Sequence, residues 1–289
     1  MRQFDRQYRF IAPGLEIGAM SSGQPMATRV NFLVEKAETE SPNSARISLW
    51  NLNPEQLAIL NTPDCMIMLR AGYKDMMPLI FVGTVVFVST RLDGADRETE
   101  IEAVDGRVCI RDTYVSLSYA GKINSKKIIS DTAMEMGVVV SFSYNAQFYD
   151  FPYGFSFVGA ARSILDKACA SSGLQWHIQN GILQIKNRND TMNRKAFVLS
   201  PDSGLLHIPK KIMLGPESNM VDSQGSSDEE RPGYEVEYFM NGAINVSDYV
   251  RLESEKVMGY FRLESVELRG DNIQGDWVCR ATLIEVSPS

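Results

Sequence analysis

Histidine is scarce in this sequence, and its scarcity limits the chemistry that the chain can perform. Only His177 and His207 occur among 289 residues. His177 stands next to Trp176 in a strand-like segment, and neither histidine has the spacing of a metal or nucleophile site. A packed or surface side chain is the simpler interpretation of both. Mechanisms that need several histidines therefore lack their parts.

Cysteine and positive charge are also limited. The formal net charge is -7, and the basic residues occur only in short pairs such as Lys126-Lys127 and Lys210-Lys211. Because phosphate neutralisation needs a basic face, direct DNA recognition is excluded. The cysteines lie far apart, without the paired short spacing of zinc or thiol-exchange sites, so we expect buried, reduced thiols. They are Cys65, Cys109, Cys169 and Cys279.

Long apolar runs are missing as well. The longest, Leu79 to Val88, is too short to cross a bilayer and is typical of a buried strand. Met1 to Gly14 carries three arginines with no uninterrupted apolar stretch behind them, so no secretory signal is indicated. We expect a soluble protein, made in a cytoplasm, with no membrane span.

No motif for catalysis or cofactor binding is evident. Gly154 to Gly159 lacks the spacing of a phosphate-binding loop, and Ser156 lacks the glycines of a nucleophile elbow. Acidic pairs such as Glu229-Glu230 fall in polar segments, where solvated carboxylates are the default. The sequence therefore predicts no catalytic, cofactor-binding or metal-binding residues, no cofactor, and no enzyme activity.

The remaining pattern predicts a β-rich α+β protein in three parts. Residues 1–112 form the first part, a β module with an N-terminal arm. A short helix interrupts its strands, with Asn53 as the cap, Pro54 in the first turn and Pro63 as the stop. Alternation of apolar and polar residues defines the strands. They are Val30 to Lys36, Ala45 to Asn51, Cys65 to Tyr73, Leu79 to Arg91 and Glu98 to Asp105.

The second part, residues 113–195, is expected to be a small α+β unit. Ser125 and Ser156 are placed to cap two helices, which are expected to end near Gly137 and Gly173. Helical spacing of apolar residues supports both helices.

Two Asn-Gly dipeptides predict tight turns between strands. Asn180-Gly181 lies between Leu174 to Gln179 and Ile182 to Lys186, where it predicts a hairpin. Asn241-Gly242 is expected to introduce a strand over Ile244 to Ser254.

The third part, residues 196–289, is expected to be a second β module. Its polar stretch 217–233 cannot bury enough apolar surface to order itself and is expected to be a flexible loop. The apolar phase of one later strand slips between Leu263 and Val266, which predicts a β-bulge. Trp277 to Val286 carries apolar residues on both faces, so either a helix or a neighbouring subunit is expected to cover it.

Aromatic residues gather between Tyr144 and Phe157. Such a segment either packs onto its own domain or offers a platform for a sugar or peptide. Packing onto its own domain is the commoner outcome. We therefore treat the stretch 144–157 as a candidate contact and nothing more.

The two β modules echo each other at an offset of about 180 residues. Cys65 to Gly72 corresponds to Asp248 to Ser254, and Glu98 to Val104 corresponds to Trp277 to Ile284. The sequence thus predicts one β module used twice, with the α+β unit between the copies.

Several segments also carry a family resemblance. They are Ile47 to Leu52 (ISLWNL), Leu69 to Tyr73 (LRAGY), Ile80 to Gly83 (IFVG), Ile101 to Gly106 (IEAVDG), Ser203 to Pro209 (SGLLHIP) and Arg262 to Asp271 (RLESVELRGD), closing on Trp277. Together they resemble the baseplate hub proteins of contractile phage tails, the late-control D type, which are similar in fold to the hub part of type VI secretion spikes. The resemblance consists of strand and turn patterns.

The resemblance implies a structural homotrimer in which each chain offers two tail-tube-like β-barrel modules. Three chains then present six similar units to the sixfold tail tube, while the other side of the ring holds a threefold central spike. The implied partners are the tail tube protein, the central spike protein and other baseplate proteins near the wedge and sheath, with a tape measure protein as a further candidate. DNA only passes through the channel during ejection, so the implied location is the virion tail baseplate, assembled in the host cytoplasm.

Three other functions stay open on the sequence alone. A tail tube initiator or distal tail subunit shares the barrel fold, although it needs only one barrel per position. A tail-associated cell-wall hydrolase needs a zinc triad or a carboxylate pair, which the sequence does not plainly provide. A surface-binding module would use the aromatic stretch. The hub accounts best for a duplicated module and is our prediction.

Overall fold

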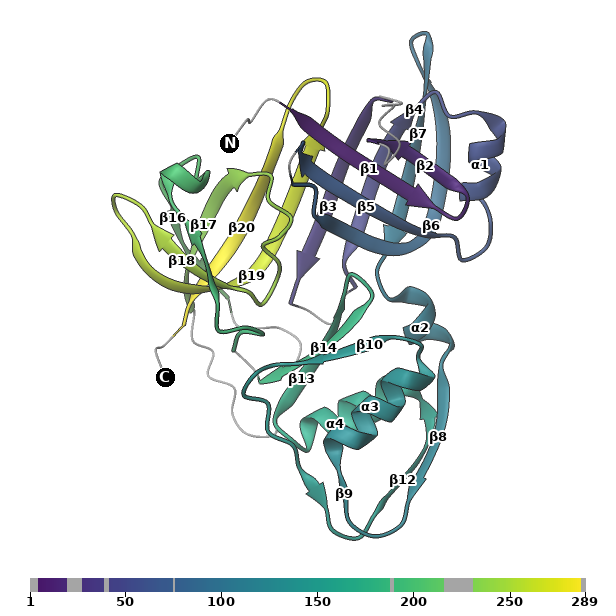
Figure 1. The fold of residues 1–289 in the computed structure, drawn as a ribbon, viewed down its shortest axis with the longest axis vertical. Coiled ribbons are helices and arrows are strands. Elements are labelled where there is room, and N and C mark those ends of the chain that lie inside the picture. Colours follow the sequence, from purple (N-terminus) through teal and green to yellow (C-terminus); the bar gives the residue numbers. More distant parts are fainter. Residues whose placement is uncertain are drawn as a thin grey trace.

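The protein is β-rich with a few helices, as the sequence predicts. The computed structural model describes residues 5–19, 28–38, 42–74, 76–187, 190–215 and 231–286. Two β-rich parts lie side by side, and the α+β unit lies below them (Figure 1). The first β-rich part comes from the N-terminal third of the chain and the second from the C-terminal third.

Both β-rich parts belong to one 13-stranded sheet. Its main path runs β16-β17-β20-β19-β3-β4-β7-β6-β5-β1-β2, while β18 pairs with β19 and with β15. The strands are β1 (Arg6–Ala12), β2 (Leu15–Gly18), β3 (Val30–Ala37), β4 (Ser44–Trp50), β5 (Met66–Tyr73), β6 (Leu79–Asp93), β7 (Asp96–Val104), β15 (Ala196–Leu199), β16 (Lys210–Leu214), β17 (Arg231–Phe239), β18 (Tyr249–Glu253), β19 (Met258–Asp271) and β20 (Trp277–Glu285).

The strand order repeats within this sheet. The first part runs β3-β4-β7-β6-β5, and the second runs β16-β17-β20-β19-β18. The predicted bulge is confirmed, because the register of β19 against β20 shifts between Leu263 and Ser265. A matching shift occurs in β6 between Val85 and Phe87. Within the described residues no strand pairing closes either part into a barrel, so the two barrels stay a prediction.

The two parts are joined by direct pairing and by a shared core. β3 pairs with β19 from Ala37 opposite Ser265 to Asn31 opposite Asp271. One hydrophobic cluster contains buried residues of both parts. The rings of Phe32 and Trp277 meet edge to face at 5.4 Å, and the Trp277 indole N–H donates to the Gly72 carbonyl of β5 at 3.2 Å. Burial of such large side chains gives this junction much of its stability.

The second face of the last strand is partly covered within the single chain. Trp277, Cys279 and Leu283 are buried in the shared core, as expected from their alternation. Val278 and Ile284, on the opposite face, are only 8% and 7% exposed within the single chain. Arg280 and Thr282, which lie between them on the same face, are only partly buried.

The predicted short helix is confirmed. Helix α1 (Pro54–Leu60) begins after Asn53, whose side chain accepts from the Gln56 backbone N–H, while Gln56 bonds back to the Asn53 N–H. This capping box satisfies backbone donors that a helix start leaves free. Leu60 is buried, and the helix ends before Pro63.

The α+β unit has a second hydrophobic core of its own. Helices α3 and α4 pack on each other beside the sheet β10-β14-β13, with the short pairs β8–β12 and β9–β11 at the far end (Figure 1). Helix α2 (Arg107–Asp112) lies within residues 1–112, but its Cys109 and Ile110 pack against this core. The other elements are β8 (Tyr114–Tyr119), β9 (Ile123–Asn124), α3 (Ser125–Glu135), β10 (Val139–Phe142), β11 (Asp150–Phe151), β12 (Phe155–Ala160), α4 (Ala161–Ala170), β13 (Leu174–Gln179) and β14 (Ile182–Asn187).

Both predicted helix caps in this unit are wrong. Asn124 caps α3, one residue before Ser125, whose buried hydroxyl instead meets that of Ser172 at 2.8 Å. Ser156 lies in β12, because its segment pairs with β8 and alternates like a strand, and α4 begins only at Ala161. The left-handed glycines predicted at the helix ends, 137 and 173, are confirmed by their positive φ.

Both Asn-Gly dipeptides lie in turns, as predicted. Asn180 and Gly181 have φ of 53° and 75° and join β13 to β14 as a hairpin. At Asn241-Gly242 the Ile244 backbone N–H donates to the Asn241 carbonyl at 3.3 Å, although β17 and β18 on either side of this turn do not pair with each other. The predicted strand over 244–254 is only Tyr249–Glu253, although Ile244 and Val246 before it are buried.

Residues 217–230 of the predicted flexible loop lie outside the described residues. The last three residues of that prediction, Arg231 to Gly233, are strand, because they open β17 and pair with β16.

Between them, α1 and the short 3₁₀ turn Pro201–Ser203 are the regular helical elements described within the β-rich parts. Among the described residues no helix is long and apolar enough to span a membrane.

Candidate functional site

One face of the large sheet is charged. Because side chains alternate along a strand, the residues opposite the core share this second face, which we call the polar face. The register places Arg46 of β4 beside Glu102 of β7, and Glu267 of β19 beside Glu35 of β3. Carboxylates outnumber cations on it. Its charged residues include Glu35, Arg46, Arg91, Asp93, Asp96, Glu98, Glu100, Glu102, Lys210, Glu235, Glu237, Glu267, Arg269, Asp271 and Arg280.

The cations of the polar face are paired with its carboxylates. Arg46 reaches Glu100 at 3.3 Å and Glu102 at 3.4 Å, and Arg280 reaches Glu237 at 3.2 Å. These side chains are partly exposed, so each pair contributes little to stability. The pairing fixes the positions of the cations and leaves the excess of charge negative.

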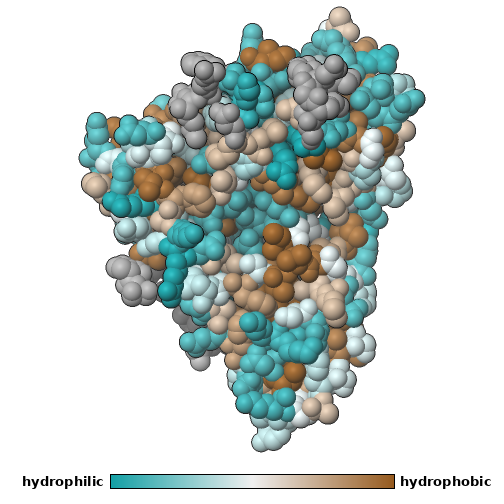
Figure 2. Space-filling view, in the orientation of Figure 1, coloured by the Kyte–Doolittle hydropathy of each residue, from teal (hydrophilic) through white to brown (hydrophobic). Residues whose placement is uncertain are grey.

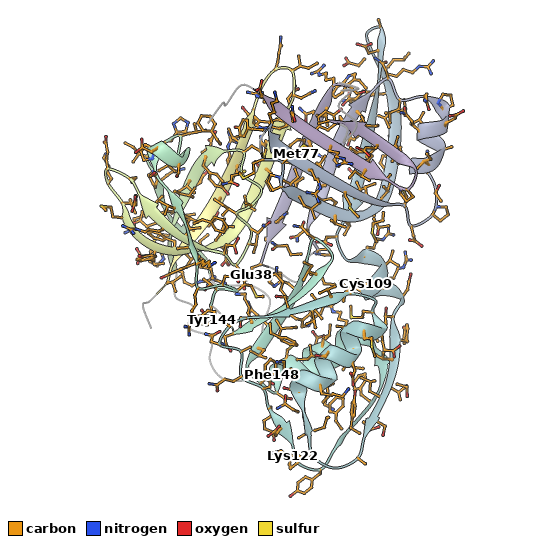
Figure 3. The ribbon with its side chains drawn as sticks, in the orientation of Figure 1. Glu38, Met77, Cys109, Lys122, Tyr144 and Phe148 are labelled. Carbon is orange, nitrogen blue, oxygen red and sulfur yellow. The ribbon has the colours of Figure 1, made fainter. Side chains whose placement is uncertain are left out.

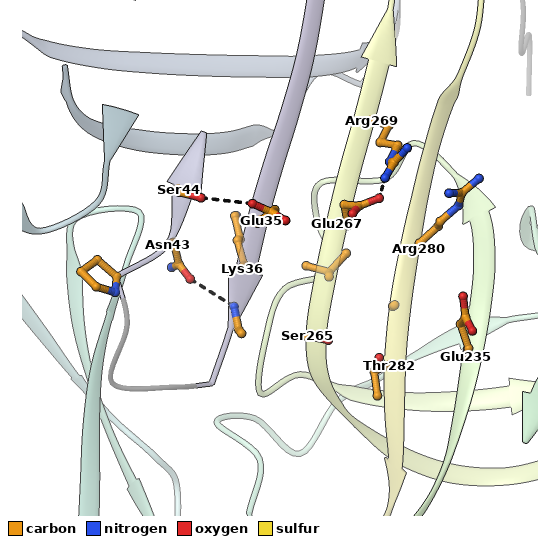
Figure 4. Close-up of a pocket in the computed structure, with 14 residues that line it drawn as sticks. Glu35, Lys36, Asn43, Ser44, Glu235, Ser265, Glu267, Arg269, Arg280 and Thr282 are labelled. Atoms are coloured by element: carbon orange, nitrogen blue, oxygen red, sulfur yellow. Dashed lines mark hydrogen bonds and ion pairs between the residues drawn. The ribbon is translucent and has the colours of Figure 1, made fainter. Parts of the chain in front are cut away.

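The polar face is hollowed where the two β-rich parts meet. A groove of about 530 Å³ is lined by residues of β3, β4, β17, β19 and β20 (Figure 4). Glu35 and Glu267 stand opposite each other in register, and Arg269 donates to Glu267. Ser44 donates to Glu35 at a long 3.4 Å in an exposed position, which is a surface contact and not an activated nucleophile. The lining suits water or a polar protein surface better than a small apolar ligand.

Glu38, directly after the end of β3, anchors the α+β unit to both β-rich parts. Figure 3 places Glu38 where the lower unit meets them. Its carboxylate pairs with Lys186 of β14 and Arg262 of β19, and it accepts from Gln175 of β13. The Lys186 side chain is fully buried, and burial lowers its pKa while the Glu38 charge opposes that shift. Arg262 also donates to Glu264 at 2.7 Å.

A second contact fastens the tip of the β13–β14 hairpin. The Asp105 carboxylate, which follows β7, accepts from the backbone N–H groups of Asn180 and Gly181. Asn43 donates to the Ile178 carbonyl at 3.3 Å. Burial raises the pKa of Asp105, although the hairpin N–H groups and Lys36 oppose the shift. The hairpin is therefore held by the loop ends of the first β-rich part.

Lys36 of β3 links the first β-rich part to the second on the core side of the sheet. Its ammonium donates to the Asn245 side chain at 2.9 Å, and burial lowers its pKa to about 8, against nearby Asp105 and Asp248. Burial raises the pKa of Asp248 to about 6. Perturbed groups can mark an active site, but these lie between packed elements and hold them together.

The histidines and cysteines take the places that simple packing predicts. His177 is buried in β13, and burial lowers its pKa to about 4, so it is neutral near pH 7. All four cysteines are free thiols, and only Cys109, which Figure 3 labels at the upper right of the α+β unit, is half-buried rather than buried. No group of three His, Cys, Asp or Glu side chains in the described part of the chain is placed to hold a metal ion. His207 lies in the loop before β16.

The aromatic segment divides by residue type. Its phenylalanines pack against the core of the α+β unit, and the rings of Phe151 and Phe155 are 5.2 Å apart. Its tyrosines are exposed, and Tyr153 is 96% exposed at the tip of the unit. Figure 3 shows Lys122 at the same tip and Tyr144 and Phe148 closer to the β-rich parts. Figure 2 shows one hydrophobic patch near the middle of this face and others among hydrophilic surface toward the top and left of the view.

Sequence reasoning missed the contacts of Glu38, Asp105, Lys186 and Arg262. Glu38 and Arg262 are separated by 224 residues and Asp105 and Asn180 by 75. No local pattern announces such pairs, since side-chain spacing reports only neighbours on the same helix or strand.

The fold is similar to that of solved phage tail proteins. A 43 kDa tail protein of prophage MuSo2 from Shewanella oneidensis has a TM-score of 0.64 and 8% identity, with 97% of this chain and 98% of that chain covered. A tail protein from Neisseria meningitidis MC58 has a TM-score of 0.61 and 10% identity, with 98% and 97% covered.

A third relative in fold is the E. coli c3393 protein, described as a component of the type VI secretion system with structural similarity to the T4 tail proteins gp27 and gp5. Its TM-score is 0.58 at 8% identity, and the match covers 96% of this chain and 77% of that chain. No curated protein matches the chain in sequence.

These likenesses show that the chain has a fold found in phage tail proteins. Residues 44–251 match the family described as Baseplate hub gp41. The chain belongs to this family and is a baseplate hub protein, a structural component of the tail baseplate that associates with other baseplate proteins.

Proposed function

We propose that three copies of this chain form a ring that joins the sixfold tail tube to the threefold central spike and leaves a channel for DNA. In this arrangement residues 1–112 and 196–289 act as two tube-like modules, and residues 113–195 form the α+β unit between them. The chain acts as a scaffold without catalysing a reaction.

One observation carries the proposal. A single chain holds the strand order β3-β4-β7-β6-β5 and its counterpart β16-β17-β20-β19-β18 side by side in one sheet. A trimer of such chains offers six related surfaces, and this resolves the mismatch between a threefold spike and a sixfold tube. A subunit with a single module would offer only three.

The polar face is the candidate wall of the channel. It is continuous across both β-rich parts, and its carboxylates outnumber its cations. A negatively charged wall repels phosphates and keeps DNA from adhering as it slides. The buried contacts of Glu38 and Asp105 hold the α+β unit rigidly below, on the side where a spike or another baseplate protein would dock.

The test is the assembly state of the purified chain, alone and with its neighbours in the tail. Native mass spectrometry is expected to show a trimer that binds the tail tube protein on one side and the spike protein on the other. A chain that stays monomeric at micromolar concentration and binds neither protein would contradict the proposal.

A further inference from the structure

The two β-rich parts differ in how they use one strand edge. The edge of β19 that faces away from β20 is filled twice, by β18 over 258–262 and by β3 over 265–271. The matching edge of β6 is filled once, by β5 over 79–84. From 86 to 93, among the described residues, β6 pairs only with β7, on its other edge.

The open edge of β6 carries exposed apolar side chains. Phe87 is 54% exposed and Leu92 is 77% exposed, although β6 is not an edge strand and lies between β7 and β5. An open strand edge is a template for pairing with another chain, so proteins usually cover or charge it. Its counterpart on β19 is covered by β3, which pairs with β19 from Ser265 to Asp271.

The strand that would pair with this edge is β16, which also has one edge without a partner strand among the described residues. β16 holds the position in the second part that β3 holds in the first, because each pairs with the strand next to the central hairpin. Whereas β3 pairs on both edges, β16 pairs only with β17 within the described residues. Its Met213 is 55% exposed.

We propose that β16 of one copy pairs with residues 86–93 of β6 in the next copy, as β3 pairs with β19 within the chain. The pairing rests on the proposed trimeric ring and supplies its contact between copies. Each copy offers one donor strand and one acceptor edge, so the contact is heterologous and closes into a ring if the rotation permits. In a trimer, three internal junctions then alternate with three between copies.

The repeat also fixes the register of this pairing. Counted from the two bulges, Ser89 of β6 corresponds to Glu267 of β19. The pairing can be followed from β20 through β17 to β16 in the second part, and from β7 through β4 to β3 in the first. By this path Ile212 of β16 takes the place of Glu35 of β3. Since Glu267 faces Glu35 within the chain, Ser89 faces Ile212 of the neighbouring copy.

Side chains fit this register. Two residues along, Phe87 faces Leu214 of the neighbour, which buries an exposed ring against an apolar side chain. In the other direction Lys210 faces Arg91. That pair of cations is offset by Glu98, which holds Arg91 at 2.8 Å, and by Asp93 further along β6.

Cysteine cross-linking of the full chain tests the register. The double variant Ser89→Cys with Ile212→Cys places two thiols directly opposite between copies, within reach of a disulfide. The matched control, Ser89→Cys with Lys211→Cys, moves one thiol to the other face of β16. Mild oxidation of the trimer is expected to give covalent dimers and trimers at least about fivefold more abundantly in the first variant than in the control.

The outcomes separate this inference from the ring itself. A trimer in native mass spectrometry whose two variants cross-link equally, or not at all, overturns the strand pairing and leaves the proposed function intact. Absence of any trimer in the unmodified chain overturns both.

Discussion

At the residue scale, buried charge decides how the parts of this protein are held. Glu38 alone compensates two buried cations, Lys186 and Arg262, which come from different parts of the chain. A buried ion pair contributes little compared with apolar packing, but removing one partner leaves the other charge uncompensated. The network thus makes the position of the α+β unit specific.

The first prediction concerns this carboxylate. Glu38→Gln keeps the size of the side chain but removes its charge, and it is expected to lower the free energy of unfolding by about 3 to 5 kcal/mol. Urea denaturation of the purified chain measures the change. Glu135→Gln, at an exposed position near the end of α3, is the control and should change stability by less than about 0.5 kcal/mol. Equal stability of both variants would show that Lys186 and Arg262 find other compensation.

None of these residues could be identified from the sequence. Lys186 sits in an ordinary strand pattern, and Glu38 directly precedes a short segment between two strands. Sequence patterns report which residues share a face of one element, whereas the contacts of Glu38 depend on how three distant elements pack.

At the element scale, the pairing of β3 with β19 joins the two β-rich parts. Gly270 of β19 makes the close approach possible, because a Cβ at this position would lie 2.2 Å from the ring of Phe32 and 2.8 Å from that of Trp277. The aromatic pair therefore occupies the space that a side chain would need.

The second prediction tests this packing. Gly270→Ala is expected to displace Phe32 and Trp277 and to lower the free energy of unfolding by about 1 to 3 kcal/mol. The control is Gly215→Ala, where a methyl group meets none of the described atoms within 4 Å. Thermal or urea unfolding measures both variants. A Gly270→Ala protein as stable as the control would mean that the aromatic rings can move aside freely.

Elements with strong local signals were the predictable ones. The Asn53 cap of α1, the Asn180-Gly181 hairpin and the bulge after Leu263 all follow from residues close in sequence. Ser156 misled the prediction because a serine before apolar residues suits a helix start and a strand equally well. Pairing with β8 decided for the strand.

At the scale of the whole molecule, the polar face gives the proposed ring its chemical character. Its charges come from strands of both β-rich parts, and Arg46 and Arg280 are already occupied by Glu102 and Glu237. The charge left over is negative, as a passage for DNA requires.

The third prediction follows from that charge. Neutralising Glu100 and Glu102 to glutamine weakens the repulsion between the wall and phosphate and is expected to slow DNA release at least about twofold, with a larger effect at low salt. An ejection assay on assembled phage measures it. The control neutralises Glu55 and Glu135, which lie on helices away from the polar face and change the net charge equally. Unchanged release in the first variant would place these residues outside the channel.

The sequence by itself determined the β-rich α+β class, the repeat of one strand pattern at both ends of the chain, and the family resemblance, because alternation and turn residues are local properties of the chain. Only the tertiary structure decided that β3 pairs with β19 to make one sheet, that Glu38 and Asp105 clamp the α+β unit, and which strand edges stay open. Those features depend on contacts between segments from 75 to more than 200 residues apart, which packing selects and sequence spacing does not encode.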